Sequence, residues 1–139
     1  MRRLHVMTNS LPIAEVLKSA DGIELTLTGG FLYRRLGVLL GPLCEQMLRT
    51  VAADVVIMGI GGVSQEGFGN NNTLVVGSER TMIEVSRKVV VVTDHTKFGR
   101  AAMLPVAPLA TADVVVTDTG LESSYAELLE AAGVEVQRV

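Results

Sequence analysis

Small polar residues and glycines gather in five short segments, each directly after a run of mostly apolar residues. The segments cover residues 8–10, 28–30, 59–62, 93–97 and 117–120. Together they offer backbone N–H groups, hydroxyl groups and a few charges, which suits a small, hydroxylated, anionic ligand. In open α/β sheets, ligands bind beyond the carboxyl ends of the strands, so these segments are the predicted binding loops.

The segment after Val89–Val92 carries the strongest candidates, Asp94 and Lys97. Lys97 could neutralise a phosphate or polarise a sugar oxygen, and Asp94 could bind sugar hydroxyls or cap its own loop. The alternative is a solvated loop with local Asx hydrogen bonds. We favour the ligand role because loops at this position carry function more often than other segments. Arg34 and Arg35 could also meet an anion, although simple surface solvation explains them equally well.

Known catalytic and cofactor motifs are missing from the sequence. The Gly59-x-Gly61-Gly62 loop has Ser64 where a dinucleotide-binding fingerprint needs its third glycine, and neither a phosphate-binding P-loop nor a G-x-S-x-G elbow is present. The glycines either let the chain turn sharply off a strand or let a ligand approach, and both can hold. Two histidines and one cysteine are too few for a typical zinc site. We therefore predict no metal, no cofactor and no catalytic residues, although a carboxylate pair stays open.

The predicted elements alternate between strands and helices, as in a mostly parallel α/β sheet flanked by helices on both faces. The whole chain, residues 1–139, is predicted to form a single domain. The Val-rich runs at 55–58, 89–92 and 114–117 are predicted to be strands buried on both faces. Residues 59–72 are predicted to form a loop. The remaining predicted strands cover 4–7, 23–27 and 134–136, with a short apolar piece at 37–40. The predicted helices cover 12–18, 42–50, 79–87 and 125–132, the last capped by Ser123 and Ser124.

Composition limits the classes of function. The 139 residues carry a net charge of −3 and only 4% aromatic residues. Few aromatic rings argue against a base-stacking nucleic-acid module, and the acidic balance makes the chain a poor DNA binder by itself. The sequence shows neither a signal peptide nor a membrane-spanning stretch, so we expect a cytoplasmic protein without membrane partners.

Several motifs, in order along nearly the whole chain, resemble the sugar-phosphate sensor domain of DeoR-family bacterial transcriptional regulators. They include Thr8-Asn9-Ser10-Leu11-Pro12, Thr28-Gly29-Gly30 with Arg34, Asp94-x-x-Lys97-Phe98-Gly99 and Thr117-Asp118-Thr119-Gly120. The resemblance implies a fold akin to ribose-phosphate isomerase and glucosamine-phosphate deaminase (CoA-transferase-like). It also implies a phosphorylated sugar or polyol effector. The family's sheet has a further central strand before Met1, so a partner chain could cover the gap, and we expect a homo-oligomer. By position it places eight residues at the effector site: Asn9, Gly29, Gly30, Arg34, Gly59, Gly61, Asp94 and Lys97.

The sequence departs from the family in two ways. Members carry an N-terminal winged helix-turn-helix, and their sensor domain begins earlier than Met1 does here, with a strand and a Gly-Thr-Thr-type loop. We therefore expect DNA binding only through that absent module. The family also has an aspartate where this chain has Gly61-Gly62. Two alternatives to an effector sensor stay open: an isomerase- or deaminase-like enzyme, and a folded chain that binds nothing.

Overall fold

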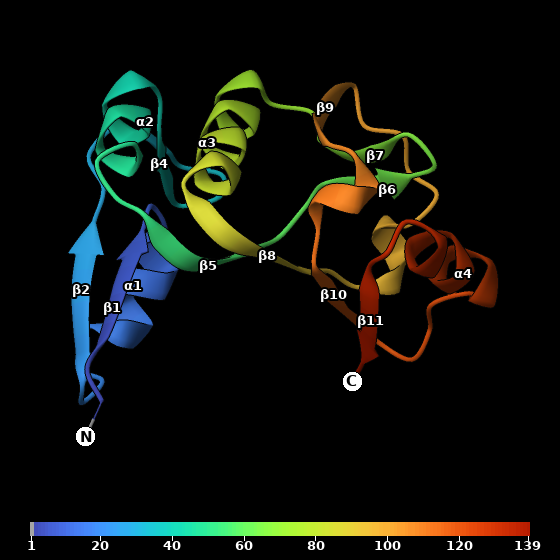
Figure 1. Ribbon diagram of the computed structural model, residues 1–139. Helices are drawn as coiled ribbons and strands as arrows, with labels where there is room; N and C mark the ends of the chain where they lie inside the picture. Colours follow the sequence, from blue (N-terminus) through green and yellow to red (C-terminus); the bar gives the residue numbers. More distant parts are fainter. Residues whose placement is uncertain (1) are drawn as a thin grey trace. The chain divides into compact units, whose positions relative to one another are not determined.

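The computed structural model describes residues 2–139, whose backbone forms two compact units, residues 2–51 and residues 52–139 (Figure 1). The predicted fold class is confirmed: the second unit holds a four-stranded parallel sheet with helices packed on it, and the first holds a parallel strand pair. The single-domain organisation stays a prediction. None of the helices formed by residues 2–139 has the length and apolar character needed to cross a membrane.

The first unit opens with a β-α-β motif. Strands β1 (Leu4–Thr8) and β2 (Ile23–Leu27) pair in parallel and are joined by α1 (Leu11–Leu17). Ser10 caps α1, and a proline in its first turn favours helix initiation. An antiparallel pair follows, β3 (Phe31–Tyr33) with β4 (Val38–Leu40), and then α2 (Pro42–Leu48). Of these, only β3 has no counterpart among the predicted segments.

The second unit is built on β5 (Ala53–Met58), β8 (Ser86–Val92), β10 (Val114–Thr117) and β11 (Glu135–Arg138). They lie in the order β11-β10-β8-β5 and all pair in parallel. The carboxyl ends of β5, β8 and β10 therefore open onto one edge of the sheet. This edge is where the segments after residues 58, 92 and 117 meet.

Burial on both faces holds for only part of this sheet. In β10, Val114 and Val115 lie on opposite faces and are 5% and 0% exposed, which confirms the prediction there. In β8, Val89 and Val91 are buried but Val92 is 46% exposed, so the prediction is wrong at the end of that strand. In β5, however, Val56 and Met58 join the core, whereas Val55 and Ile57 are 44% and 69% exposed. The prediction of a doubly buried strand is wrong for β5, which is an edge strand and alternates between a covered and an open face.

Two helices pack with the sheet into the core of the second unit. Helix α3 (Thr73–Glu84) begins six residues before the predicted start at Glu79, because Asn72 caps it by accepting from the N–H groups of Leu74 and Val75. The predicted end at Arg87 is also wrong, since the chain already pairs with β5 from Ser86 onward. Helix α4 (Ser123–Ala131) begins at the residue predicted to cap it, and no side chain caps it.

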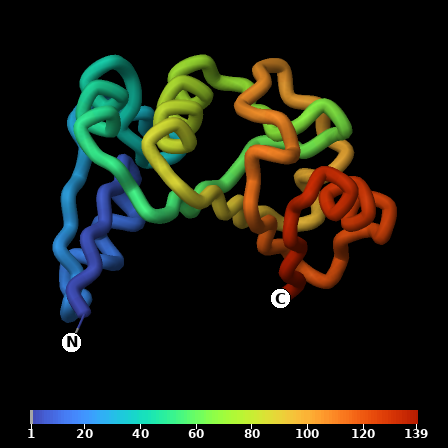
Figure 2. The backbone as a smooth tube through the Cα atoms, viewed as in Figure 1, coloured from blue at the N-terminus to red at the C-terminus, as the bar shows by residue number. Residues whose placement is uncertain are grey.

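The predicted loop at 59–72 contains a hairpin instead. Strands β6 (Gly62–Ser64) and β7 (Gly67–Asn70) pair antiparallel, and β9 (Leu104–Ala107) pairs with β7 (Figure 2 traces this path). The glycines that suggested a loop allow backbones to lie close, because a Cβ at Gly67 would lie 2.4 Å from the carbonyl oxygen of Ala107. Two short 3₁₀ helices, η1 (His95–Lys97) and η2 (Leu109–Thr111), complete the unit.

Candidate functional site at the carboxyl edge of the sheet

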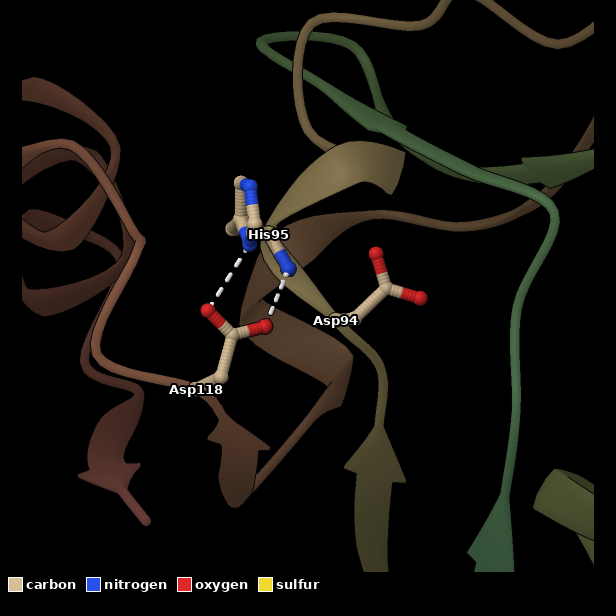
Figure 3. A group of neighbouring side chains, drawn as sticks. All are labelled: Asp94, His95 and Asp118. Carbon is tan, nitrogen blue, oxygen red and sulfur yellow. Dashed lines mark hydrogen bonds and ion pairs between the residues drawn. The ribbon is translucent and has the colours of Figure 1, made fainter.

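The loops after β8 and β10 are joined by a doubly bonded pair, His95 and Asp118 (Figure 3). The backbone N–H of His95 donates to one carboxylate oxygen of Asp118 at 2.8 Å, and Nδ1 of the imidazole lies 2.8 Å from the other. The N–H of Gly120 also donates to that second oxygen, at 2.7 Å. Three polar contacts therefore hold one carboxylate at the junction of the two loops.

Asp94 organises the loop that follows β8. Its carboxylate accepts from the backbone N–H of Thr96 at 2.8 Å and from the Thr96 hydroxyl, and so caps η1. Lys97 closes this short helix, and its charge also favours the ionised carboxylate. The sequence left two roles open for Asp94, capping its own loop and binding a ligand. The structure shows the cap, and the ligand role stays a prediction.

Both carboxylates are held in their ionised form. The pKa of Asp94 is lowered chiefly by the hydrogen bond from the Thr96 side chain, and the pKa of Asp118 chiefly by the backbone N–H of His95. An ionised carboxylate only accepts hydrogen bonds. Nδ1 of His95 therefore carries a hydrogen, and the arrangement fixes which ring nitrogen faces Asp118.

The loop after β5 lies against the same segment. A Cβ at Gly59 would lie 3.9 Å from the carbonyl oxygen of Val92, and Phe98 bridges to Val63. We call Gly59, Asp94, His95, Lys97 and Asp118 the strand-end site. Its carboxylates, imidazole and ammonium can bind hydroxyl and anionic groups together.

Gly61 has a clear packing role. A Cβ there would lie 2.7 Å from Oδ1 of Asn70 and 3.2 Å from the carbonyl oxygen of Gly69, and its own N–H donates to that carbonyl. A larger residue would displace the hairpin. The structure thus supplies a structural reason for this glycine, and its contact with an effector stays a prediction.

The other predicted residues lie in the first unit, where the ends of β1 and β2 are adjacent. Asn9 donates from Nδ2 to the carbonyl oxygen of Leu39 at 3.0 Å, which ties β1 to β4. Gly30 has a φ of +133° and a Cβ there would lie 2.5 Å from the carbonyl oxygen of Leu40. Gly29 has open space around it, and Arg34 is exposed in the β3–β4 turn. Asn9 and Gly30 therefore serve the fold, and ligand contacts of all four stay predictions.

Four residues with pronounced local chemistry were not among the predicted site residues: His95, Asp118, Asn70 and Glu79. The first two occupy the predicted binding segments, so their position was signalled, although their pairing was not. Asn70 donates to Glu79 at 3.0 Å, and burial raises the pKa of that carboxyl to about 7. No spacing in the sequence marks this pair, because β7 and α3 meet only in the folded chain.

Among residues 2–139, three side chains of the strand-end site form a group that could hold a metal ion. Asp94, His95 and Asp118 each offer one ligand atom within 4.8 Å of the others. Nδ1 of His95 and Oδ1 of Asp118 already satisfy each other at 2.8 Å, and both side chains are substantially exposed, at 49% and 37%. The atoms are thus arranged as a hydrogen-bonded pair, and the expectation of no metal site stays a prediction.

A parallel α/β sheet with polar, charged loops at its carboxyl edge is the architecture of a small-molecule-binding domain. Residues 1–119 match the family described as the DeoR C terminal sensor domain, and the chain belongs to this family. This confirms the family resemblance drawn from the motifs.

Several transcriptional regulators are similar in sequence to this chain over most of its length. It is 30% identical to the HTH-type transcriptional repressor GlcR of Bacillus subtilis (strain 168) and 34% identical to the HTH-type transcriptional regulator GlpR of Haloferax volcanii, each over 94% of this chain and 51% of the relative. It is 32% identical to the glycerol-3-phosphate regulon repressor of Escherichia coli (strain K12), over 91% of this chain and 50% of the relative. The chain thus spans about half the length of these relatives.

Proposed function

We propose that the chain is the effector-sensing part of a transcriptional regulator and binds a phosphorylated sugar or polyol at the strand-end site. Binding of the effector changes the DNA affinity of a helix-turn-helix segment of the longer regulator. The observation that carries the proposal is the meeting of an anion-binding side chain, Lys97, with fixed hydroxyl-binding groups at one sheet edge. Membership of the sensor-domain family supports it.

The two halves of such a ligand match the two kinds of group present. The Lys97 ammonium suits a phosphate, whereas the ionised carboxylate of Asp94 and the imidazole of His95, which Asp118 holds, can bind sugar hydroxyls. The charges of Asp94 and Asp118 repel any anion, so hydrogen bonds from ligand hydroxyl groups must offset this repulsion. A ligand with both a phosphate and hydroxyl groups therefore satisfies the site better than inorganic phosphate does.

Ligand binding is tested by titration calorimetry and thermal shift on the 139-residue chain. The panel contains glycerol 3-phosphate, suggested by the name of one relative, several hexose and pentose phosphates, and inorganic phosphate as control. We expect one organic phosphate to raise the melting temperature in proportion to the logarithm of its concentration, well beyond inorganic phosphate. A folded sample that responds to no organic phosphate contradicts the proposal.

We further propose that the chain senses and does not catalyse. The alternative, an isomerase- or deaminase-like enzyme, is favoured by the positioned imidazole of His95, which could move a proton. The relatives named above are transcriptional regulators, which supports a sensor. Incubation of the chain with the bound sugar phosphate, followed by NMR, separates the two. Recovery of the unchanged ligand is expected, and steady conversion contradicts the sensor.

The proposed sensor role also suggests the partners of the whole regulator. We propose a cytoplasmic homo-oligomer that contacts DNA only through its helix-turn-helix segment, since this chain carries a net charge of −3. Sedimentation equilibrium measures the assembly, and an operator-shift assay compares the chain with the full-length regulator. A salt-dependent shift by this chain alone contradicts the assignment of DNA binding to the other segment.

A further inference from the structure

His95 is fixed in position by one contact of its backbone and one of its imidazole ring. Its backbone N–H and its Nδ1 both engage the carboxylate of Asp118, at 2.8 Å each, so the ring and the main chain are held by one group. Within residues 2–139, no hydrogen bond is formed by the other ring nitrogen, Nε2. The side chain is 49% exposed, so this nitrogen is accessible to a small molecule.

Gly120 makes room for this arrangement. A Cβ at that position would lie 2.7 Å from Nδ1 of His95, 2.9 Å from its Cγ and 2.8 Å from Oδ1 of Asp118. The backbone of Gly120 does not have a positive φ, so conformation does not require a glycine there. A glycine is needed there because a side chain would overlap the His95 ring. Gly120 lies in the loop after β10, whereas His95 lies in the loop after β8.

We propose that His95 is a ligand-contacting residue of the effector site, which binds a hydroxyl group of the effector through Nε2, and that Asp118 and Gly120 position its ring. The inference rests on the proposed function and goes further by dividing the ligand between two side chains. His95 recognises a sugar or polyol hydroxyl, whereas Lys97 binds the phosphate. His95 therefore determines specificity between a sugar phosphate and phosphate alone.

The hydrogen-bonding roles follow from the ionised state of Asp118. Because that carboxylate only accepts, Nδ1 donates to it, and an imidazole whose single N–H hydrogen is on Nδ1 carries a lone pair on Nε2. A lone pair accepts a hydrogen bond from a hydroxyl group and repels a fully ionised phosphate oxygen. The charged groups around the ring are Asp118 after β10, and Asp94 and Lys97 on its own loop.

The test compares two amide replacements of the same ring. In His95→Asn, the amide N–H₂ can replace the donor Nδ1 and keep the contact with Asp118, but nothing replaces Nε2. In His95→Gln, the longer side chain reaches the position of Nε2. The matched control is His5→Asn, since His5 is also exposed and also contacts a carboxylate, that of Glu24 at 3.0 Å.

Titration calorimetry at pH 8 then measures binding of the best organic phosphate from the panel above and of inorganic phosphate. We expect His95→Asn to weaken the organic phosphate about tenfold, as for loss of one good hydrogen bond. Inorganic phosphate should change less than about twofold by the same reasoning. His95→Gln should recover part of the loss, and His5→Asn should bind like the unmodified chain.

A double-mutant cycle tests the positioning role of Asp118. Asp118→Asn should weaken the organic phosphate in the unmodified chain and have no further effect in the His95→Asn background, because Asp118 acts through the ring. Melting temperatures without ligand accompany every variant. They separate a lost contact from a loss of folding.

Three results would overturn the inference. If the unmodified chain binds an organic phosphate and His95→Asn binds it equally well, His95 makes no contact, and the proposed function stands. Equal weakening of the organic phosphate and of inorganic phosphate shows that His95 does not read the hydroxyl. If the unmodified chain binds no member of the panel, the proposed function and this inference fail together.

Discussion

Nδ2 of Asn70 donates a hydrogen bond to Oε1 of Glu79 at 3.0 Å and thereby joins β7 to α3. The second carboxyl oxygen of Glu79, Oε2, is buried and has no hydrogen-bond partner among the described residues. Oδ1 of Asn70 lies only 2.7 Å from the position that a Cβ on Gly61 would take. A buried carboxyl is thus linked through one amide to the loop that follows β5.

Replacement of Glu79 by glutamine should change how stability depends on pH. Burial raises the pKa of this carboxyl from 4.5 to about 7 in the folded chain. The folded state therefore binds the proton more tightly, and the stability that this gives below pH 4.5 is lost as the pH rises toward 7. Glu79→Gln should remove this loss and raise the free energy of unfolding at pH 8 by roughly 1–3 kcal/mol.

Urea unfolding at several values between pH 4.5 and pH 8 measures the effect. The control is Glu84→Gln, on the same helix but exposed, which should leave the pH profile unchanged. Parallel profiles for Glu79→Gln and the unmodified chain would show that Glu79 is ionised without penalty in the fold.

Alanine at Gly67 should be much more disruptive than alanine at Gly133. Both glycines have a positive φ, +125° and +84°, but a Cβ at Gly67 would lie 2.4 Å from the backbone oxygen of Ala107, whereas Gly133 has open space. We expect losses of roughly 2–4 kcal/mol for Gly67→Ala, from strain and overlap together. Gly133→Ala should lose about 1 kcal/mol, from strain alone. Chemical denaturation measures both, and equal losses would contradict close packing of β7 on β9.

The cap of α3 offers a test of why that helix begins where it does. Oδ1 of Asn72 accepts from the N–H groups of Leu74 at 2.9 Å and Val75 at 3.1 Å. Asn72→Ala should lower the free energy of unfolding by about 1 kcal/mol, and Asn72→Asp and Asn72→Ser should restore most of it. Urea denaturation gives the three values. If alanine is as stable as serine, the side chain does not determine the start of the helix.

Lys97 should account for the electrostatic part of effector binding. Lys97→Ala should weaken the organic phosphate about tenfold or more, since a hydrogen bond to a charged group contributes about 1.5–3 kcal/mol. The affinity of the unmodified chain should fall with added salt, and that of the variant should fall less steeply. Calorimetry at two salt concentrations measures both. Lys88→Ala, which removes an exposed lysine from β8, is the control and should bind normally.

The sequence anticipates the local part of the site well. Asp94 and Lys97 share one turn after one strand, so their proximity follows from chain connectivity, and the structure places both in η1. The pairing of His95 with Asp118 depends instead on the adjacency of β8 and β10. Because 23 residues separate these two side chains, only the strand order brings them together.

The sequence is a poorer guide where glycine serves packing. The glycines between 59 and 72 predict a loop, but this segment forms the β6–β7 hairpin, and at Gly67 and Gly69 the lack of a side chain lets the backbone of β9 lie close to β7. A glycine-rich segment can either bend into a loop or lie close to another backbone. Composition does not tell which of the two occurs. The exposed face of β5 could not be predicted for a comparable reason. An all-apolar run of residues fits an edge strand as well as a central strand.

By itself, the sequence determined the α/β class, the family and the loops in which ligand-binding groups gather, because these depend on local patterns of apolar and polar residues. Only the tertiary structure decided the strand order, the hairpin, the exposed face of β5 and the contacts of His95 and Glu79. Those features arise from pairing and burial between distant segments. Their energies depend on which surfaces meet in space, which local residue patterns do not encode.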